Sequence, residues 1–156
     1  MSSYTATLTW LRDDQPFSDG KYSRAHEIAF DGGVTMPASS SPHVVRVPLS
    51  REDAVDPEEM FVASLSSCHM LFFLDFARRG GFVVDAYVDD AEGVMGKDDR
   101  GRMAMTQVKL NPQIAWGGDK TPTPEEIREL HHKAHEACFI ANSFRGDVAI
   151  AEGEAH

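Results

Sequence analysis

The order of apolar patterns along the chain predicts an α+β fold. Alternating runs typical of strands come first and a long helical pattern follows them. Further strands, a second helix and a last strand complete the order. The chain has 156 residues, a length that favours one domain over residues 1–156. A domain of this size is expected to bury a core that needs neither disulfides nor a structural metal.

The first third of the chain contains short strand patterns. Residues Tyr4–Leu11 alternate apolar and polar side chains, which predicts a half-buried strand. Arg24–Phe30 and Val34–Met36 flank Asp31-Gly32-Gly33, and this arrangement indicates a hairpin. The valines of the segment Val44–Val47 form a short edge strand at most, because prolines and serines surround them.

A long helix is predicted to follow this region. Asp56 offers an N-cap, Pro57 suits the first helical position, and two glutamates occupy the first turn. The pattern ends at Gly80-Gly81, a pair typical of a helix C-terminus. The helix is apolar around most of its circumference, which predicts deep burial. Its apolar positions include Phe61, Leu65, Cys68, Phe72 and Phe76.

The rest of the chain is expected to form two longer strands, a second helix and a last strand. The strands are Val83–Met95 and Met103–Trp116, and the last strand is Asp147–Ile150. Thr123-Pro124-Glu125-Glu126 has the Thr-x-x-Glu pattern of a capping box and predicts the start of the second helix. The apolar stripe of that helix contains Ile127, Leu130, Ala134, Cys138 and Ala141.

Composition excludes several classes of function. The chain has 15 Lys and Arg against 25 Asp and Glu, a net charge of −10, which argues against nucleic acid as a partner. Residues Met1–Trp10 lack the pattern of a signal peptide. The longest apolar run, Met70–Leu74, is far shorter than a membrane span, so we expect a cytoplasmic protein without membrane contact. The glycine motifs of serine hydrolases, nucleotidases and dinucleotide enzymes do not occur.

The two cysteines are the first candidates for chemistry. Cys68 follows a patch of small polar residues, Ser64–Ser67, inside an apolar helix, and Cys138 lies among three histidines and Glu136. Structural disulfides are rare in the cytoplasm, so these thiols are either buried hydrophobes or reactive groups. Their polar surroundings favour the second interpretation.

A reactive thiol at Cys68 would need a nearby cation. Cys68 is about three turns from the predicted start of its helix, too far for the helix dipole to lower its pKa. His69 is a poor partner within the same helix, because consecutive residues point about 100° apart. We therefore expect His69 to be a packed imidazole and an arginine to supply the charge.

A metal site is an alternative for the second helix. His131, His135 and Cys138 are spaced i, i+4 and i+7, so they share one face and could hold Zn²⁺ with one further ligand. The alternative interpretation is a pair of histidines on the polar face beside a buried thiol.

Both cysteine segments resemble the OsmC/Ohr family, the osmotically inducible protein C and organic hydroperoxide resistance proteins. Asp56–Cys68 resembles the first cysteine helix of that family, with Pro-Glu at its start and the Cys ten positions after the Glu. Ala134–Cys138, followed by Asn142-Ser143, resembles the second cysteine helix. The resemblance covers about residues 56–150. Phe139 stands where the family often has Pro.

The resemblance implies an OsmC-like fold in which antiparallel sheets pack around two long helices of an intertwined homodimer. It also implies a thiol-dependent peroxidase that reduces alkyl or lipid hydroperoxides without a metal, flavin or haem cofactor. Cys68 would become a sulfenic acid, and Cys138 would form a disulfide with it that an external dithiol reduces. The phenylalanines around Cys68 would suit a bulky apolar peroxide. A module that binds a hydrophobic ligand or senses oxidation without turnover is the alternative.

The resemblance further implies that an arginine stabilises the Cys68 thiolate and that Glu58 orients it. Arg24 follows the first predicted strand, where the family places this arginine, and Arg12 and Arg46 are the other candidates. Ten residues of helix separate Glu58 from Cys68 by about 15 Å. The helix is therefore broken or the site is built across the dimer, and we predict the second.

Overall fold

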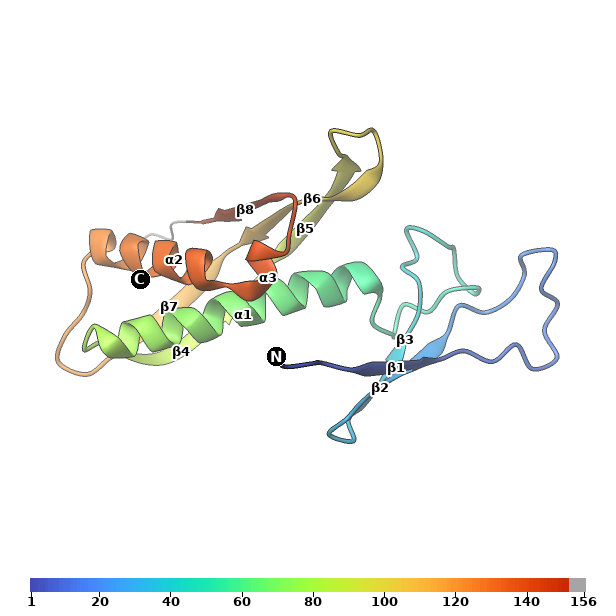
Figure 1. Cartoon of the computed structure of the whole chain (residues 1–156), viewed down its shortest axis with the longest axis horizontal. Coiled ribbons are helices and arrows are strands. Elements are labelled where there is room, and N and C mark those ends of the chain that lie inside the picture. The colour runs from blue at the N-terminus through green and yellow to red at the C-terminus, as the bar shows by residue number, and fades with distance from the viewer. Residues whose placement is uncertain (152–156) are drawn as a thin grey trace. The chain divides into compact units, whose positions relative to one another are not determined.

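The computed structural model describes residues 1–151, which form two compact units. The first unit is Met1–Met60 and the second begins at Phe61. Helix α1, Pro57–Arg79, is continuous and contributes residues to both units (Figure 1). The predicted α+β class, with antiparallel sheets and two main helices, is confirmed.

The N-terminal unit contains one antiparallel sheet of three strands. Its order is β1 (Ala6–Thr9), β2 (His26–Phe30) and β3 (Thr35–Ala38). The predicted hairpin is confirmed, and its turn contains Gly33 at a φ of +89°, a conformation that favours glycine. The expected half-burial of β1 is wrong, because all four of its residues are exposed. The segment Val44–Val47 lies outside the strands, which agrees with the expectation of a short edge strand at most.

Helix α1 has the predicted bounds. The carboxylate of Asp56 accepts a hydrogen bond of 2.8 Å from the backbone N–H of Glu59, and Gly81 follows the helix with a φ of +81°. The expected deep burial is wrong for the single chain, because only one stripe of the helix is packed and Leu71 is 60% exposed. The buried residues of this stripe are Leu65, His69, Phe73 and Ala77.

The composition of α1 also corrects the expectation about membrane spans. By length and composition alone α1 could cross a membrane, a property it shares with core helices of soluble proteins. The length of the apolar run Met70–Leu74 alone does not reveal this property. The small residues before the run are only weakly polar, so they barely lower the average hydropathy of the helix.

The C-terminal unit contains two sheets. Strands β4 (Val83–Asp89) and β7 (Pro112–Gly117) form an antiparallel pair. In the other sheet β6 (Met103–Leu110) lies between β5 (Glu92–Lys97) and β8 (Asp147–Ile150). The β5–β6 pairing is antiparallel and the β6–β8 pairing is parallel. The predicted last strand is thereby confirmed.

The two long strands predicted for this unit are each divided in two. The first is interrupted at Asp90-Ala91 and the second at Asn111. Each predicted strand changes partner at its interruption, because its two halves belong to different sheets. Alternation of apolar and polar residues predicts a strand, and it does not predict which strand will pair with it.

The second main helix, α2 (Pro124–Ala137), begins with the predicted capping box. The backbone N–H of Glu126 donates to Thr123 Oγ1, and the N–H of Thr123 donates to Glu126 Oε1, both at 3.1 Å. The expected continuation of the helix through Cys138 is wrong. Cys138 has an extended backbone, and a separate short helix, α3 (Phe139–Asn142), follows it.

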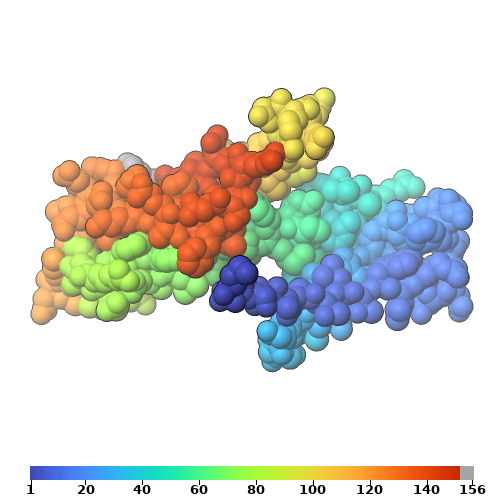
Figure 2. Space-filling model, in the orientation of Figure 1, coloured from blue at the N-terminus to red at the C-terminus, as the bar shows by residue number. Residues whose placement is uncertain are grey.

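Two apolar cores hold the C-terminal unit together. One packs α1 and α2 on the β4–β7 sheet, and the other packs the first half of α1 on β6, α3 and β8. The two main helices lie side by side in this unit (Figures 1 and 2). The first core contains Phe73, Ala77, Phe82, Leu130 and Ala134, and the second contains Leu65, Val108 and Leu110.

Replacement of Phe73 by Ala is expected to lower the free energy of unfolding by about 3–5 kcal/mol, because it leaves a cavity in the first core. Phe139→Ala is the matched control. Phe139 is 70% exposed and makes one aromatic contact, so its loss should cost about 1 kcal/mol. Urea denaturation measures both variants, and equal losses would contradict the assigned core.

Candidate functional site

Cys68 lies midway along α1 and is half-buried. It stands beside the buried stripe, between Leu65 and His69. On the same helix, Ser66 Oγ donates a hydrogen bond to a carboxylate oxygen of Asp89 at the end of β4. This bond ties the segment that carries the thiol to the β4–β7 sheet.

Cys138 occupies the junction between α2 and α3 and is fully buried. Its backbone N–H donates to the carbonyl of Ala134 at 2.9 Å, and its Sγ accepts from the N–H of Ala141 at 3.4 Å. The residue thus ends one helix and begins the next. This fixes the direction of its side chain.

The structure brings the two thiols of one chain together. Burial, together with the nearby Cys68 thiol, raises the pKa of the Cys138 thiol to about 11. Both cysteines are free. At neutral pH Cys138 is therefore a protonated thiol, while Cys68 is the member of the pair that solvent reaches.

A pair of buried histidines lies between α1 and α2. Nε2 of His69 and Nδ1 of His131 are 3.0 Å apart, and the rings are stacked with centroids 5.2 Å apart. Burial lowers the pKa of His131 to about 4, and burial together with His131 lowers the pKa of His69 to about 4. Both rings are neutral at pH 7. The expectation that His69 is a packed imidazole is confirmed.

The alternative zinc site does not assemble. His131 faces His69, and the described residues place no group of three or more His, Cys, Asp or Glu where it could hold a metal. His135 Nδ1 is buried without a hydrogen-bond partner, and His132 forms an ion pair of 3.2 Å with Glu136 when protonated.

Sequence analysis missed a polar cluster at the end of β4. Asp89 accepts hydrogen bonds from Ser66 Oγ at 2.5 Å and from the backbone N–H of Asn111 at 2.6 Å. The Tyr87 hydroxyl is buried without a hydrogen-bond partner, and both burial and Asp89 raise its pKa. Ser66 and Asn111 are each more than twenty positions from Asp89 in the sequence, so no local spacing could have connected them.

Arg24, the predicted thiolate-stabilising residue, lies in the N-terminal unit and is held by its own loop. Its Nη1 donates to the carbonyls of Gly20 at 2.7 Å and Tyr22 at 2.5 Å. Its guanidinium lies 3.8 Å from the centroid of the Tyr22 ring. Of the other candidates, Arg12 is exposed and Arg46 lies in a segment of turns.

The arginine borders an apolar pocket of about 550 Å³ in the N-terminal unit. Trp10, Phe17 and Tyr22 form its aromatic wall, with ring centroids 4.7–5.9 Å apart. Trp10 Nε1 donates to the carbonyl of Ser23 at 2.8 Å, which connects this wall to the loop of Arg24.

Glu58, the predicted orienting carboxylate, lies in the first turn of α1. Its Oε2 is buried without a hydrogen-bond partner, and none of the ion pairs among the described residues joins it to Arg24. Helix α1 is unbroken, so Glu58 and Cys68 of one chain lie about 15 Å apart along its axis. A broken helix is thereby excluded as the way to unite them.

Two phenylalanines flank the thiol pair. Phe72 is one turn beyond Cys68 on α1, and Phe139 directly follows Cys138. Their rings are in edge contact, with centroids 5.1 Å apart. The thiols therefore have apolar neighbours on both of the segments that carry them.

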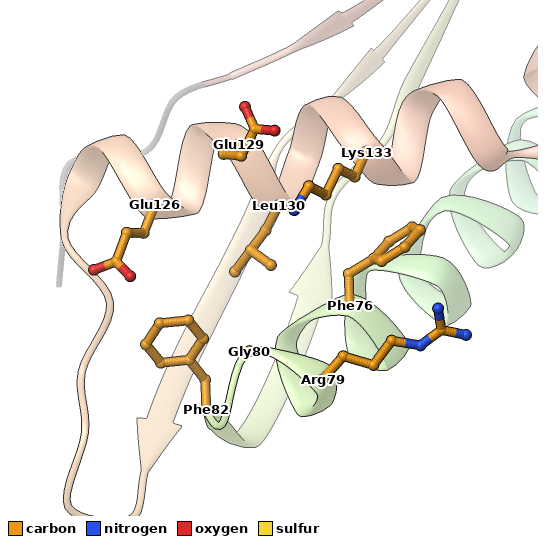
Figure 3. Close-up of a pocket in the computed structure, with 8 residues that line it drawn as sticks. All are labelled: Phe76, Arg79, Gly80, Phe82, Glu126, Glu129, Leu130 and Lys133. Atoms are coloured by element: carbon orange, nitrogen blue, oxygen red, sulfur yellow. The ribbon is translucent and has the colours of Figure 1, made fainter.

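The C-terminal unit also contains a pocket, of about 460 Å³, which lies between the end of α1 and the start of α2. Figure 3 shows the side chains of Phe82 and Leu130 pointing into it, with charged residues of α2 along its edge. Neither cysteine lines it. Two of its charged residues already have partners, because Arg79 forms an ion pair with Asp75 and Glu126 belongs to the capping box.

The different environments of the two thiols predict different reactivity. Iodoacetamide at pH 7.5 should modify Cys68 about tenfold faster than Cys138, because the latter is buried with a raised pKa. Peptide mass mapping over time measures both sites. Equal rates would contradict the assigned burial, and unfolding in urea should make the rates similar.

The histidine pair predicts a loss of stability in acid. Since the pKa of each folded imidazole is below its ordinary value of 6.5, the neutral pair favours folding above pH 6.5, and this contribution falls toward pH 4. Between pH 7 and pH 5 the two imidazoles gain protons in the unfolded chain and remain neutral in the folded protein, so each should lower the free energy of unfolding by about 2 kcal/mol. Urea denaturation at both pH values measures it.

The control is the double variant His69→Gln with His131→Asn. It retains hydrogen-bonding groups at the positions of Nε2 and Nδ1 and cannot titrate in this range. It should lack this part of the pH dependence. A variant as sensitive to acid as the natural protein would refute the assignment.

Comparisons with known proteins agree with this architecture. The family model described as OsmC-like protein matches residues 50–152. An OsmC-like protein of unknown function from Vibrio cholerae is 50% identical, with a TM-score of 0.94 over 96% of this chain and 98% of that chain. No curated protein matches the sequence significantly.

More distant structures share the fold. An organic hydroperoxide resistance protein from Elizabethkingia anophelis is 20% identical, with a TM-score of 0.69 over 96% of this chain and 93% of that one. The organic hydroperoxide resistance protein OhrB of Bacillus subtilis is also 20% identical, with a TM-score of 0.64 over 96% and 95% of the two chains. The family model and the relative of 50% identity together show that the chain belongs to the OsmC-like protein family.

Proposed function

We propose that the protein is a cysteine-based peroxidase that reduces alkyl or lipid hydroperoxides. The observation that carries the proposal is the meeting of two free thiols of one chain, one half-exposed and one buried. Membership of a family that includes organic hydroperoxide resistance proteins supports it. The two free thiols also fit a cytoplasmic protein.

The first proposed step oxidises Cys68. Its thiolate attacks the terminal oxygen of the hydroperoxide, the O–O bond breaks, and an S–O bond forms. The alkoxide leaves with a proton as the alcohol, and Cys68 remains as a sulfenic acid. The exposed side of Cys68 is where the peroxide approaches, and the Phe72–Phe139 pair favours apolar substituents.

The second proposed step forms a disulfide. The Cys138 sulfur attacks the sulfur of the Cys68 sulfenic acid, and hydroxide leaves with the thiol proton as water. A dithiol reductant then exchanges with the disulfide and restores both thiols. The raised pKa of Cys138 fits this order, because it keeps the buried thiol protonated and leaves Cys68 as the thiol that meets the peroxide first.

Arg24 and Glu58 complete the proposal. Arg24 stabilises the Cys68 thiolate, and Glu58 orients its guanidinium through an ion pair. Because α1 is unbroken, we place Glu58 of one protomer and Cys68 of the other in one site of a homodimer. The buried Oε2 of Glu58, which has no hydrogen-bond partner among residues 1–151, supports a charged partner from the second protomer.

The apolar pocket in the N-terminal unit favours a second candidate function, the binding of a hydrophobic ligand without turnover. In that case the cysteines would only report oxidation. The relative of 50% identity has no known function, so it does not decide between the two. A measurement of hydroperoxide turnover distinguishes the peroxidase from the ligand-binding function.

The peroxidase proposal predicts consumption of cumene hydroperoxide in the presence of a dithiol. Cys68→Ser should lower the rate by more than about 100-fold, because it removes the nucleophile. Cys138→Ser should react once and then stall as a sulfenic acid. A peroxide assay and intact mass measure these outcomes, and one equivalent of peroxide should remove two hydrogens from the natural protein.

His132→Ala is the control, because His132 is exposed and its recorded ion pair joins it to Glu136. It should leave turnover unchanged. Absence of turnover in the natural protein would reject the peroxidase in favour of the binding function, and full activity in Cys68→Ser would reject Cys68 as the nucleophile.

A further inference from the structure

We propose that His69 and His131 are positioning residues for the thiol pair, and that their mutual hydrogen bond sets the register of α1 against α2 at which Cys68 and Cys138 meet. The catalytic consequence of this proposal rests on the proposed peroxidase function. The geometric part of the proposal does not depend on that function, since it concerns only the distance at which the two thiols are held.

Each histidine is placed to control one cysteine. His69 directly follows Cys68 on α1, and His131 lies on α2 seven residues before Cys138, the residue that caps the end of that helix. The backbone N–H of Cys138 donates to the carbonyl of Ala134, so Cys138 is tied to the last turn of α2. A contact that fixes the two histidines therefore helps to fix α1 at Cys68 and the end of α2 that holds Cys138.

The other recorded contacts between these helices are apolar. Phe73 and Ala77 of α1 pack with Leu130 and Ala134 of α2 in the first core. Apolar packing has little directional preference, so it determines register weakly. The His69–His131 bond is a side-chain hydrogen bond between α1 and α2. It is a directional contact at this interface.

Burial makes the bond obligatory. His69 is 1% exposed and His131 is 7% exposed, and the Phe73 ring lies 4.3 Å from the His131 ring between centroids. Two neutral imidazoles share one N–H, one as donor and the other as acceptor. If the helices moved out of register, a buried nitrogen would lose its partner without gaining water, which is unfavourable.

Other polar groups act on His69 without replacing this bond. Asp89 of β4 and His135 of α2 affect the pKa of His69, and neither has a recorded hydrogen bond to it. Asp89 instead binds Ser66 and the backbone of Asn111. The histidine pair is thus a local contact between α1, which contains Cys68, and α2, which ends directly before Cys138.

Register matters because a disulfide has strict geometry. The Cα atoms must come within about 7 Å, and one residue of slip along a helix moves a thiol by about 1.5 Å. If Cys138 cannot reach the Cys68 sulfenic acid, a second hydroperoxide can oxidise that sulfenic acid. That step forms a sulfinic acid and releases a second molecule of alcohol. The histidine pair would therefore determine how the sulfenic acid is divided between disulfide and sulfinic acid.

Two pairs of matched substitutions test the geometry. Gln at position 69 can place its amide near Nε2, whereas Asn is too short. Asn at position 131 can place its amide near Nδ1, whereas Gln extends past it. We therefore expect His69→Gln and His131→Asn to retain the contact, and His69→Asn and His131→Gln to lose it. A role in polarity or volume alone would not produce this reversed preference at the two positions.

The first measurement is independent of peroxidase activity. The protein is equilibrated in redox buffers of reduced and oxidised dithiothreitol, and the Cys68–Cys138 disulfide is quantified by intact mass. Loss of the contact should weaken disulfide formation about tenfold, which corresponds to about 30 mV for this couple. Variants that retain it should remain within about threefold of the natural protein.

Phe82→Leu controls for loss of stability. Phe82 belongs to the first core and touches Trp116, with no recorded contact to either histidine. It should lower stability without changing the disulfide equilibrium. Equal equilibria in all four histidine variants would overturn the proposal, and so would equal losses in all four. A shift of similar size in Phe82→Leu would also overturn it.

The second measurement follows the sulfenic acid. With ten equivalents of cumene hydroperoxide, His69→Asn and His131→Gln should accumulate sulfinic acid at Cys68, while the natural protein forms the disulfide. Consumption of the first equivalent should be unchanged. If the natural protein does not consume peroxide, the proposed function fails, and the redox equilibrium still decides the role of the histidines.

Discussion

The packing of one stripe of α1 is the constraint on which the C-terminal unit depends. Leu65 belongs to the core formed with β6, α3 and β8, and Phe73 belongs to the core formed with α2 and the β4–β7 sheet. His69 lies between them on the same stripe, and Cys68 stands beside it. The candidate site therefore lies where the two cores meet.

Cys138 occupies the corresponding boundary on the other side. Ala134, one turn before it, is buried in the first core, while Ile140, two residues after it, packs on the second. The extended backbone of Cys138 allows the chain to leave one core and enter the other. The two thiols therefore differ in exposure. Cys68 lies at the side of α1 beside its packed stripe, whereas Cys138 at the α2–α3 junction is covered by both cores.

Local signals were enough to predict much of the fold. The capping box at Thr123, the hairpin at Asp31-Gly32-Gly33 and both ends of α1 depend on residues within a few positions of one another. The site was less predictable. The apolar spacing continues through Cys138, so the break in the helix left no periodic signal. The contact between His69 and His131 joins residues 62 positions apart, and only the packing of the two helices brings them together.

The parallel pairing of β6 with β8 has a consequence for the order of folding. It joins Gln107 to Asp147, residues 40 positions apart, and the whole of α2 and α3 lies within the loop that it closes. Such a loop is costly in entropy and slow to close. The core that covers α3 is complete when this strand docks, so the environment of Cys138 should be completed late. An oxidant that meets the nascent chain would therefore encounter two separate thiols.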